Sequence, residues 1–221
     1  MKAVVFGASG MVGQGLLREC LRDERVEAVL AVGRSALGEE HPKLTERVEK
    51  DLFALEPITG YDACFFCLGV SSVGMAPEEY ERITYQLTLS VAGKLPPDTT
   101  FVYVSGAGTD STERGRVRWA RVKGATENAL AKLPLRTFSV RPGYIQPLHG
   151  VTSKTTLYRT LYRVAMPLYP VLRRLFPGFV TTNEELGRAM LEVAENGYEK
   201  PVLENADIVT AAARRARPAG S

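Results

Sequence analysis

The stretch that decides the fold is residues 1–15, MKAVVFGASGMVGQG. Residues 3–6 form a short apolar run with two valines, which is typical of a buried parallel strand. Gly7, Gly10 and Gly13 follow, and leucines then recur at helical spacing among charged residues. The sequence therefore predicts a strand, a glycine turn and a helix, which is the opening unit of a doubly wound parallel α/β sheet.

The turn predicts a site for a pyrophosphate, because backbone N–H groups and the helix dipole both attract an anion at a helix start. The first glycine permits the tight turn, the second lets a phosphate approach, and the third lets helix and strand pack closely. The expected contacts come from Gly7, Ser9, Gly10, Met11, Val12 and Gly13. A glycine turn that binds no ligand is the alternative.

Composition narrows the class of protein. A chain of 221 residues with a net charge of +3 fits one globular domain and gives no argument for nucleic acid. No apolar run reaches membrane-spanning length, and charged residues close behind the first strand argue against a signal peptide, so we expect a cytoplasmic protein. No group of residues shows metal-ligand spacing. Cys64 and Cys67 have a redox spacing, but they lie in an apolar strand pattern and are interpreted as packing groups.

The second predicted strand, residues 28–32, ends before Arg34, and no Asp or Glu follows until Glu39. An NAD site usually presents an acid to the ribose 2′-OH at this place, whereas a 2′-phosphate prefers an arginine. A guanidinium can form a forked, charge-assisted contact with phosphate, to which Ser35 could add a hydroxyl. We therefore predict NADP(H) as the cofactor, with a solvated surface arginine as the alternative.

Three further features define a resemblance. Ser105 follows an apolar strand pattern, Trp119 and Lys123 lie four apart on a predicted helix, and Arg141-Pro142-Gly143 follows the sixth strand. Together with the Gly-x-x-Gly-x-x-Gly turn, they resemble the atypical and extended short-chain dehydrogenase/reductase (SDR) superfamily. The chain is most similar to its NmrA-like and nucleoside-diphosphate-sugar epimerase-like members. This resemblance implies a Rossmann sheet with a small helical C-terminal lobe.

The resemblance also implies roles for single residues. An aspartate and an apolar residue contact the adenine, a small residue lets the chain pass under the ribose, the serine polarises the substrate carbonyl, and the lysine holds the nicotinamide ribose. The matching positions are Asp51, Leu52, Leu68, Gly69, Ser105, Lys123, Arg141, Pro142 and Gly143.

Trp119 departs from this family pattern, in which a tyrosine supplies the proton. An indole N–H donates a hydrogen bond but transfers no proton at useful pH. Tyr144 and His149 are the nearby candidates for another acid. The sequence therefore supports two functions: an NADP(H)-dependent oxidoreductase or epimerase-like enzyme acting on an unknown carbonyl or hydroxyl substrate, or a non-catalytic NADP(H)-binding sensor.

We expect a dinucleotide-binding core in residues 1–150, a helical substrate lobe and last core helix in 151–210, and a disordered tail in 211–221. Residues 152–180 contain basic, aromatic and aliphatic residues at helical spacing without any acid. This segment predicts either a lid over the substrate or a contact with an anionic membrane surface, which would make the chain a membrane-surface accessory protein. The chain is expected to be a monomer or a homodimer.

Overall fold

The computed structural model describes residues 1–148, 169, 174–175 and 178–216. Its main sheet has seven strands in the order β3-β2-β1-β4-β5-β6-β9, and neighbouring strands run parallel. The elements are β1 (Lys2–Phe6), α1 (Met11–Arg22), β2 (Ala28–Gly33), β3 (Leu44–Val48), η1 (Leu52–Ala54), β4 (Ala63–Phe66), α2 (Pro77–Glu81), η2 (Arg82–Gln86), α3 (Leu87–Ala92), β5 (Thr100–Val104), α4 (Arg118–Leu130), β6 (Arg136–Arg141), β7 (Tyr144–Gln146), β8 (Val180–Thr182), α7 (Asn183–Asn196), β9 (Val202–Glu204) and α8 (Asn205–Arg215).

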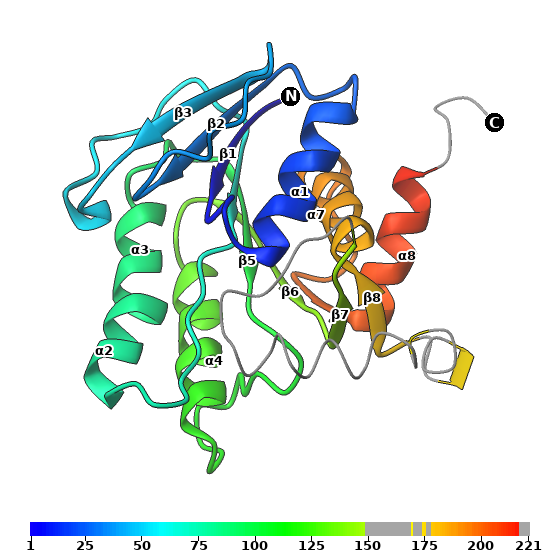
Figure 1. Cartoon of the computed structure of the whole chain (residues 1–221). Helices are drawn as coiled ribbons and strands as arrows, with labels where there is room; N and C mark the ends of the chain where they lie inside the picture. The colour runs from blue at the N-terminus through cyan, green and yellow to red at the C-terminus, as the bar shows by residue number, and fades with distance from the viewer. Residues whose placement is uncertain (149–168, 170–173, 176–177, 217–221) are drawn as a thin grey trace.

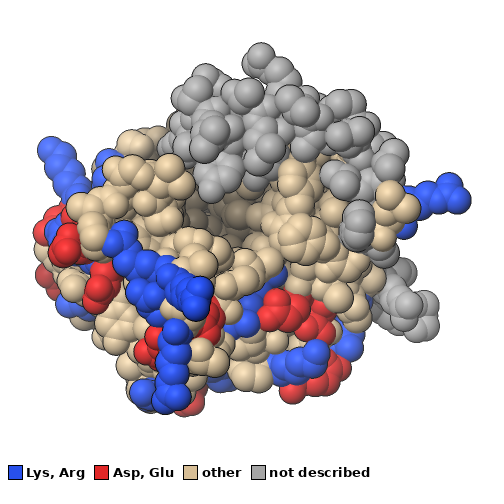
Figure 2. Space-filling model, turned by 90° about the horizontal axis from the view of Figure 1, so that it is seen from below, with Lys and Arg blue, Asp and Glu red and all other residues tan. Residues whose placement is uncertain are grey.

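Strand β1 pairs with β2 on one side and β4 on the other, so the chain reverses its winding there. In open parallel sheets the crevice outside the carboxyl ends of the strands at such a switch point is where ligands bind. The strand ends meet at the lower side of Figure 1, and Figure 2 views the molecule from that side. The predicted doubly wound parallel sheet is confirmed.

Helices cover both faces of the sheet (Figure 1). Helices α1, α7 and α8 pack on one face, and α2, α3 and α4 lie on the other. Each face has its own apolar core, so successive residues of a strand belong to different cores. Cys64 belongs to the core on the α3 side of the sheet, whereas Cys67 packs against the core on the α1 side. Burial raises the pKa of both thiols well above the ordinary value, as expected for packing groups.

The C-terminal prediction needs a correction. Residues 211–215 are not a disordered tail but the second half of α8, where Ala211, Ala212 and Arg215 are buried. The guanidinium of Arg215 donates to Asp23 at 2.8 Å and also pairs with Glu195, which fastens the end of α8 to the end of α1 and to α7. Residues 217–221 lie outside the described residues.

The predicted substrate lobe is described only in part. Most of residues 152–180 lies outside the described residues, so neither the lid nor the membrane alternative is tested there. Arg174 and Leu175 are exposed, and the short strands β7 and β8 pair in parallel as a second sheet. In the described part of the chain, no helix is long and apolar enough to cross a membrane.

Candidate functional site

The glycine turn adopts the conformation that its sequence predicts. Gly7 has φ +79°, and its carbonyl oxygen accepts from the Gly10 N–H at 2.9 Å. A Cβ at Gly13 would lie 2.1 Å from that same oxygen. Helix α1 can therefore pack close to the end of β1 only with glycine at position 13.

The start of α1 keeps its backbone donors available. Its N-cap, Gly10, contributes no side-chain hydrogen bond, and the first turn contains no acidic residue. By contrast, α7 begins with a complete capping box between Thr182 and Glu185. First-turn N–H groups have no partner within a helix, so a helix start without a capping side chain has backbone donors for an anion.

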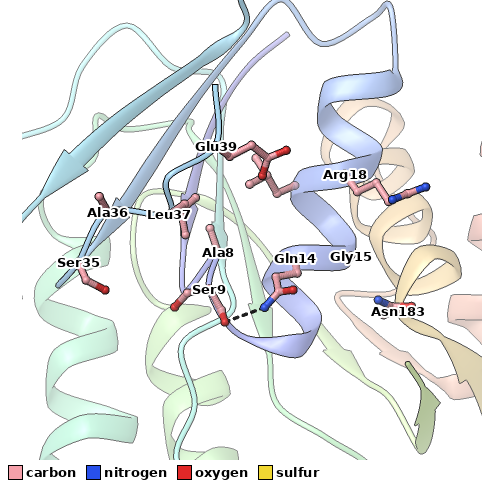
Figure 3. A pocket seen from close by; sticks show the side chains of 11 residues that line it. Ala8, Ser9, Gln14, Gly15, Arg18, Ser35, Ala36, Leu37, Glu39 and Asn183 are labelled. Atoms are coloured by element: carbon pink, nitrogen blue, oxygen red, sulfur yellow. Dashed lines mark hydrogen bonds between the residues drawn. The ribbon is translucent and has the colours of Figure 1, made fainter. Parts of the chain in front are cut away.

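Three adjoining hollows lie at the strand ends. The largest, about 480 Å³, lies between α1 and the loop after β2 (Figure 3). It is bordered by Ser9, whose carbonyl oxygen accepts from Gln14 Nε2 at 2.9 Å. The second and third hollows, about 110 and 230 Å³, share Arg34, Leu52 and Leu68.

These hollows bring together many of the residues singled out from the sequence. Gly7, Ser9, Arg34, Asp51, Leu52, Leu68 and Gly69 all line at least one of the three hollows. Asp51 also begins η1, where its Oδ1 accepts from the Phe53 N–H at 3.0 Å. Polar and apolar groups share the lining of these hollows, which suits a ligand that is itself partly polar.

Two residues that were not predicted from the sequence line the second hollow. Glu46 and Arg47 come from the edge strand β3, and both line the hollow together with Arg34. The sequence of residues 44–49 predicts only a weak edge strand. It does not show which strand β3 pairs with. The register of β3 on β2 places Arg47 opposite Val32, two residues before Arg34.

The hydroxyl of Ser105 is engaged within the fold. Ser105 is 5% exposed, and its Oγ donates to Glu127 Oε1 at 2.5 Å and lies 3.2 Å from the Val140 carbonyl oxygen. Glu127, from α4, is itself buried and ion-paired with Arg141. In this arrangement the serine proton is directed to a carboxylate. The expected contact between Ser105 and a substrate carbonyl stays a prediction.

Arg141, Pro142 and Gly143 shape the neighbouring turn through internal contacts. The Arg141 guanidinium binds Glu127, Glu204 and Ser111, which ties the loop after β5 to the end of β6. The Pro142 carbonyl accepts from Ala107 N–H at 2.9 Å, and Gly143 N–H donates to Asn205 Oδ1 at 2.9 Å. A Cβ at Gly143 would lie 2.3 Å from the Phe179 carbonyl oxygen, which explains the glycine.

Lys123 and Trp119 lie on one turn of α4, as their spacing predicts. The Lys123 ammonium donates to the Ser105 carbonyl oxygen. Burial lowers the pKa of Lys123 to about 8, although the nearby Glu127 carboxylate acts in the opposite direction. Trp119 lies against Gly108: a Cβ there would be 3.5 Å from the indole.

Of the two alternative acids, only Tyr144 belongs to the described residues. Its hydroxyl donates to Gln146 Oε1 at 2.9 Å within β7. Burial, together with the neighbouring Tyr169, raises its pKa above the ordinary value, which makes it a weaker acid. His149 lies outside the described residues.

The buried Lys123 predicts a pH effect on stability. Folded Lys123 releases its proton near pH 8, whereas the unfolded chain keeps it to about 10.5, so its contribution to the free energy of unfolding should rise between those values. The slope is at most about 1.4 kcal/mol per pH unit. Buried thiols with a raised pKa contribute an opposite slope, so the effect is measured as a difference: in urea unfolding from pH 7 to 10, Lys123→Met should lower the slope of the unfolding free energy against pH relative to the unmodified protein. Substitution of the exposed Lys132 by methionine is the matched control and should leave the slope unchanged. Equal slopes of the unfolding free energy against pH in Lys123→Met and Lys132→Met would contradict the lowered pKa of Lys123.

Comparison with known proteins places this geometry in a structural class. No protein-family model matches the chain. A Streptococcus pneumoniae TIGR4 protein described as a candidate NADH-flavin reductase is 20% identical, with a TM-score of 0.63 over 92% of this chain and 99% of that chain. A short chain dehydrogenase family protein from Francisella tularensis is 14% identical, with a TM-score of 0.61 over 92% and 95%.

The Bordetella bronchiseptica enzyme WbmH, solved in complex with NAD+, is 16% identical, with a TM-score of 0.59 over 88% of this chain and 72% of that chain. At these identities the likeness concerns the fold. The chain is an α/β protein with a parallel, doubly wound sheet. More particularly, it has the Rossmann fold seen in short-chain dehydrogenases.

Proposed function

We propose that this protein is an atypical SDR that binds NADP(H). The observation that carries the proposal is the position of Arg34, which borders two of the three hollows directly beside the glycine turn. Within the described part of the chain Arg34 has no ion-pair partner, so its charge is available for a 2′-phosphate. The uncapped start of α1 supports the same proposal, because it suits a diphosphate.

The residues present fit such a cofactor. Gly10, Met11, Val12 and Gly13 would hold the diphosphate through backbone N–H groups, and Asp51, Leu52, Leu68 and Gly69 would border the adenosine half. Lys123 would bind the nicotinamide ribose after giving up its contact with the Ser105 carbonyl. When bound, the cofactor would supply or accept a hydride.

We further propose that the reaction is an oxidoreduction or epimerisation of a small carbonyl or hydroxyl compound. Lys123 and the turn at Arg141-Pro142-Gly143 support it, because holding the diphosphate and the adenosine half alone does not need them. The proton must then come from a group other than Trp119. Solvent water is the simplest source, since the Ser105 proton is directed to Glu127.

A second candidate function is a non-catalytic NADP(H) sensor. The engaged Ser105 hydroxyl and the indole of Trp119 favour it, because neither can donate a proton to a substrate in this arrangement. Loss of nicotinamide absorbance on mixing NADPH with a panel of small aldehydes, ketones and nucleotide sugars would favour the enzyme. Tight NADPH binding without turnover across the panel would favour the sensor.

The cofactor proposal is tested by Arg34→Asp. Replacing the guanidinium by a carboxylate should lower NADPH affinity roughly 100-fold, because charge-assisted hydrogen bonds contribute about 1.5–3 kcal/mol and 1.4 kcal/mol corresponds to tenfold. NADH affinity should change by less than about threefold, because NADH has no 2′-phosphate. Isothermal titration calorimetry measures both, with exposed Arg114→Asp as a control of equal charge change. An equal loss for both cofactors would remove the 2′-phosphate assignment.

A further inference from the structure

We infer that Arg47 is a second cation of the 2′-phosphate site and decides, together with Arg34, between NADP(H) and NAD(H). The inference rests on the proposed dinucleotide function and adds a residue to it. Arg34 comes from the loop after β2, whereas Arg47 comes from the neighbouring edge strand, and both line the hollow of about 110 Å³.

The sheet register brings Arg34 and Arg47 to neighbouring strand ends that border the same hollow. Arg47 lies opposite Val32 in the β2–β3 ladder, and the pairing continues to Gly33 opposite Val48. The Glu49 N–H then donates to the Gly33 carbonyl at 2.8 Å, which holds the two strand ends side by side. Arg34 follows Gly33 directly, so the fold fixes both arginines at one corner of the hollow.

The nearest carboxylates are already engaged. Glu46 accepts from the Leu37 N–H at 2.6 Å and from the Glu39 N–H at 3.4 Å, so it shapes the loop after β2. These contacts take up about half of the acceptor sites of Glu46, which leaves it fewer for a ribose 2′-OH, the group that the acid of an NAD site binds. Arg18 borders the largest hollow, but its side chain points toward α7, where Nε lies 3.4 Å from Glu184 (Figure 3).

Glu49 competes for Arg47. Arg47 Nη2 donates to Glu49 Oε2 at 3.3 Å, a long contact between two partly exposed side chains. Pairs of this kind stabilise by about 1 kcal/mol or less. A phosphate carries up to two charges and three acceptor oxygens, more than one guanidinium can satisfy, so it would recruit Arg47 away from this partner.

The test measures NADPH and NADH affinity by calorimetry. Arg47→Met should weaken NADPH binding about tenfold or more, as expected for a lost charge-assisted contact, and leave NADH within about twofold. Lys2→Met is the control. It also removes one positive charge, but at the end of β1 that lies away from the glycine turn, and it should change neither the NADPH nor the NADH affinity. Equal weakening of both cofactors, or none, would overturn the inference.

A second variant should change NADPH affinity in the opposite direction. Glu49→Gln releases Arg47 and should strengthen NADPH binding by up to about fivefold, but it should have no effect in the Arg47→Met background. An equal gain in both backgrounds, or no gain with Arg47 present, would mean that Arg47 does not reach the phosphate. Failure of the unmodified protein to bind NADPH or NADH would instead remove the proposed function itself. Thermal melts establish that each variant is folded.

Discussion

Alanine at position 13 will lower NADPH affinity by roughly ten- to a hundredfold. The new methyl group would lie 2.1 Å from the Gly7 carbonyl oxygen, so the turn must move away from the start of α1. The free protein relieves the clash by moving the turn, and NADPH must restore the original turn to bind; the overpacking cost of about 1–3 kcal/mol then falls on binding, at tenfold in affinity for each 1.4 kcal/mol. Calorimetry with NADPH gives the affinity, and a thermal melt gives the accompanying loss of stability.

The matched control is Gly178→Ala. A Cβ at position 178 would meet Ala206 at 3.6 Å, which is an ordinary contact, so affinity and melting temperature should stay close to those of the unmodified protein. Unchanged NADPH affinity in Gly13→Ala would show that the turn does not hold the cofactor, whatever the effect on stability.

Arg215→Met will lower the free energy of unfolding by about 1.5–3 kcal/mol, because it removes charge-assisted hydrogen bonds to two carboxylates, while Asp23 keeps Arg25 as a partner. The Arg215 side chain is 1% exposed and lies between Asp23 and Glu195. Although burial opposes it, hydrogen bonds from Arg25 and Arg215 lower the pKa of Asp23 to about 2. The stabilisation from ionised Asp23 is therefore complete above its ordinary pKa of 3.8 and lost as the pH falls toward 2.

Arg214→Met provides the comparison, because Arg214 is the neighbour of Arg215 on the exposed side of α8. It pairs with Glu199 at 2.8 Å and lies over the Tyr198 ring, in solvent. Its loss should cost about 1 kcal/mol or less in urea unfolding at pH 7. Similar losses of unfolding free energy in the two variants would contradict the buried role of Arg215. They would instead support the disordered tail predicted for residues 211–221.

The parts of the molecule that could be predicted from sequence are those encoded locally. Strand β1, the glycine turn and α1 are continuous in the chain, and each glycine has a steric reason that local spacing expresses. The NADP(H) prediction at Arg34 used the same local order of strand and loop. The sequence therefore predicts the unit formed by β1, the glycine turn and α1, together with its place in the sheet.

The parts that were missed depend on contacts between distant segments. Arg47 borders the same hollow as Arg34 only through the β2–β3 register, and Ser105 reaches Glu127 only because the chain returns through α4. The alanine-rich C-terminus suggested disorder by composition. Its small residues instead fit the tight space beside α7, and Arg215 finds its carboxylate 192 positions earlier in the chain.

The switch point at β1, the third of the seven strands, separates two groups of predicted site residues. The residues expected to recognise the nucleotide end extend outward through β2 and β3, whereas Ser105, Lys123 and the Arg141 turn belong to the wing of β5 and β6. For the proposed enzyme, substitutions in β2 and β3 would change cofactor preference without altering the residues of the β5 and β6 wing.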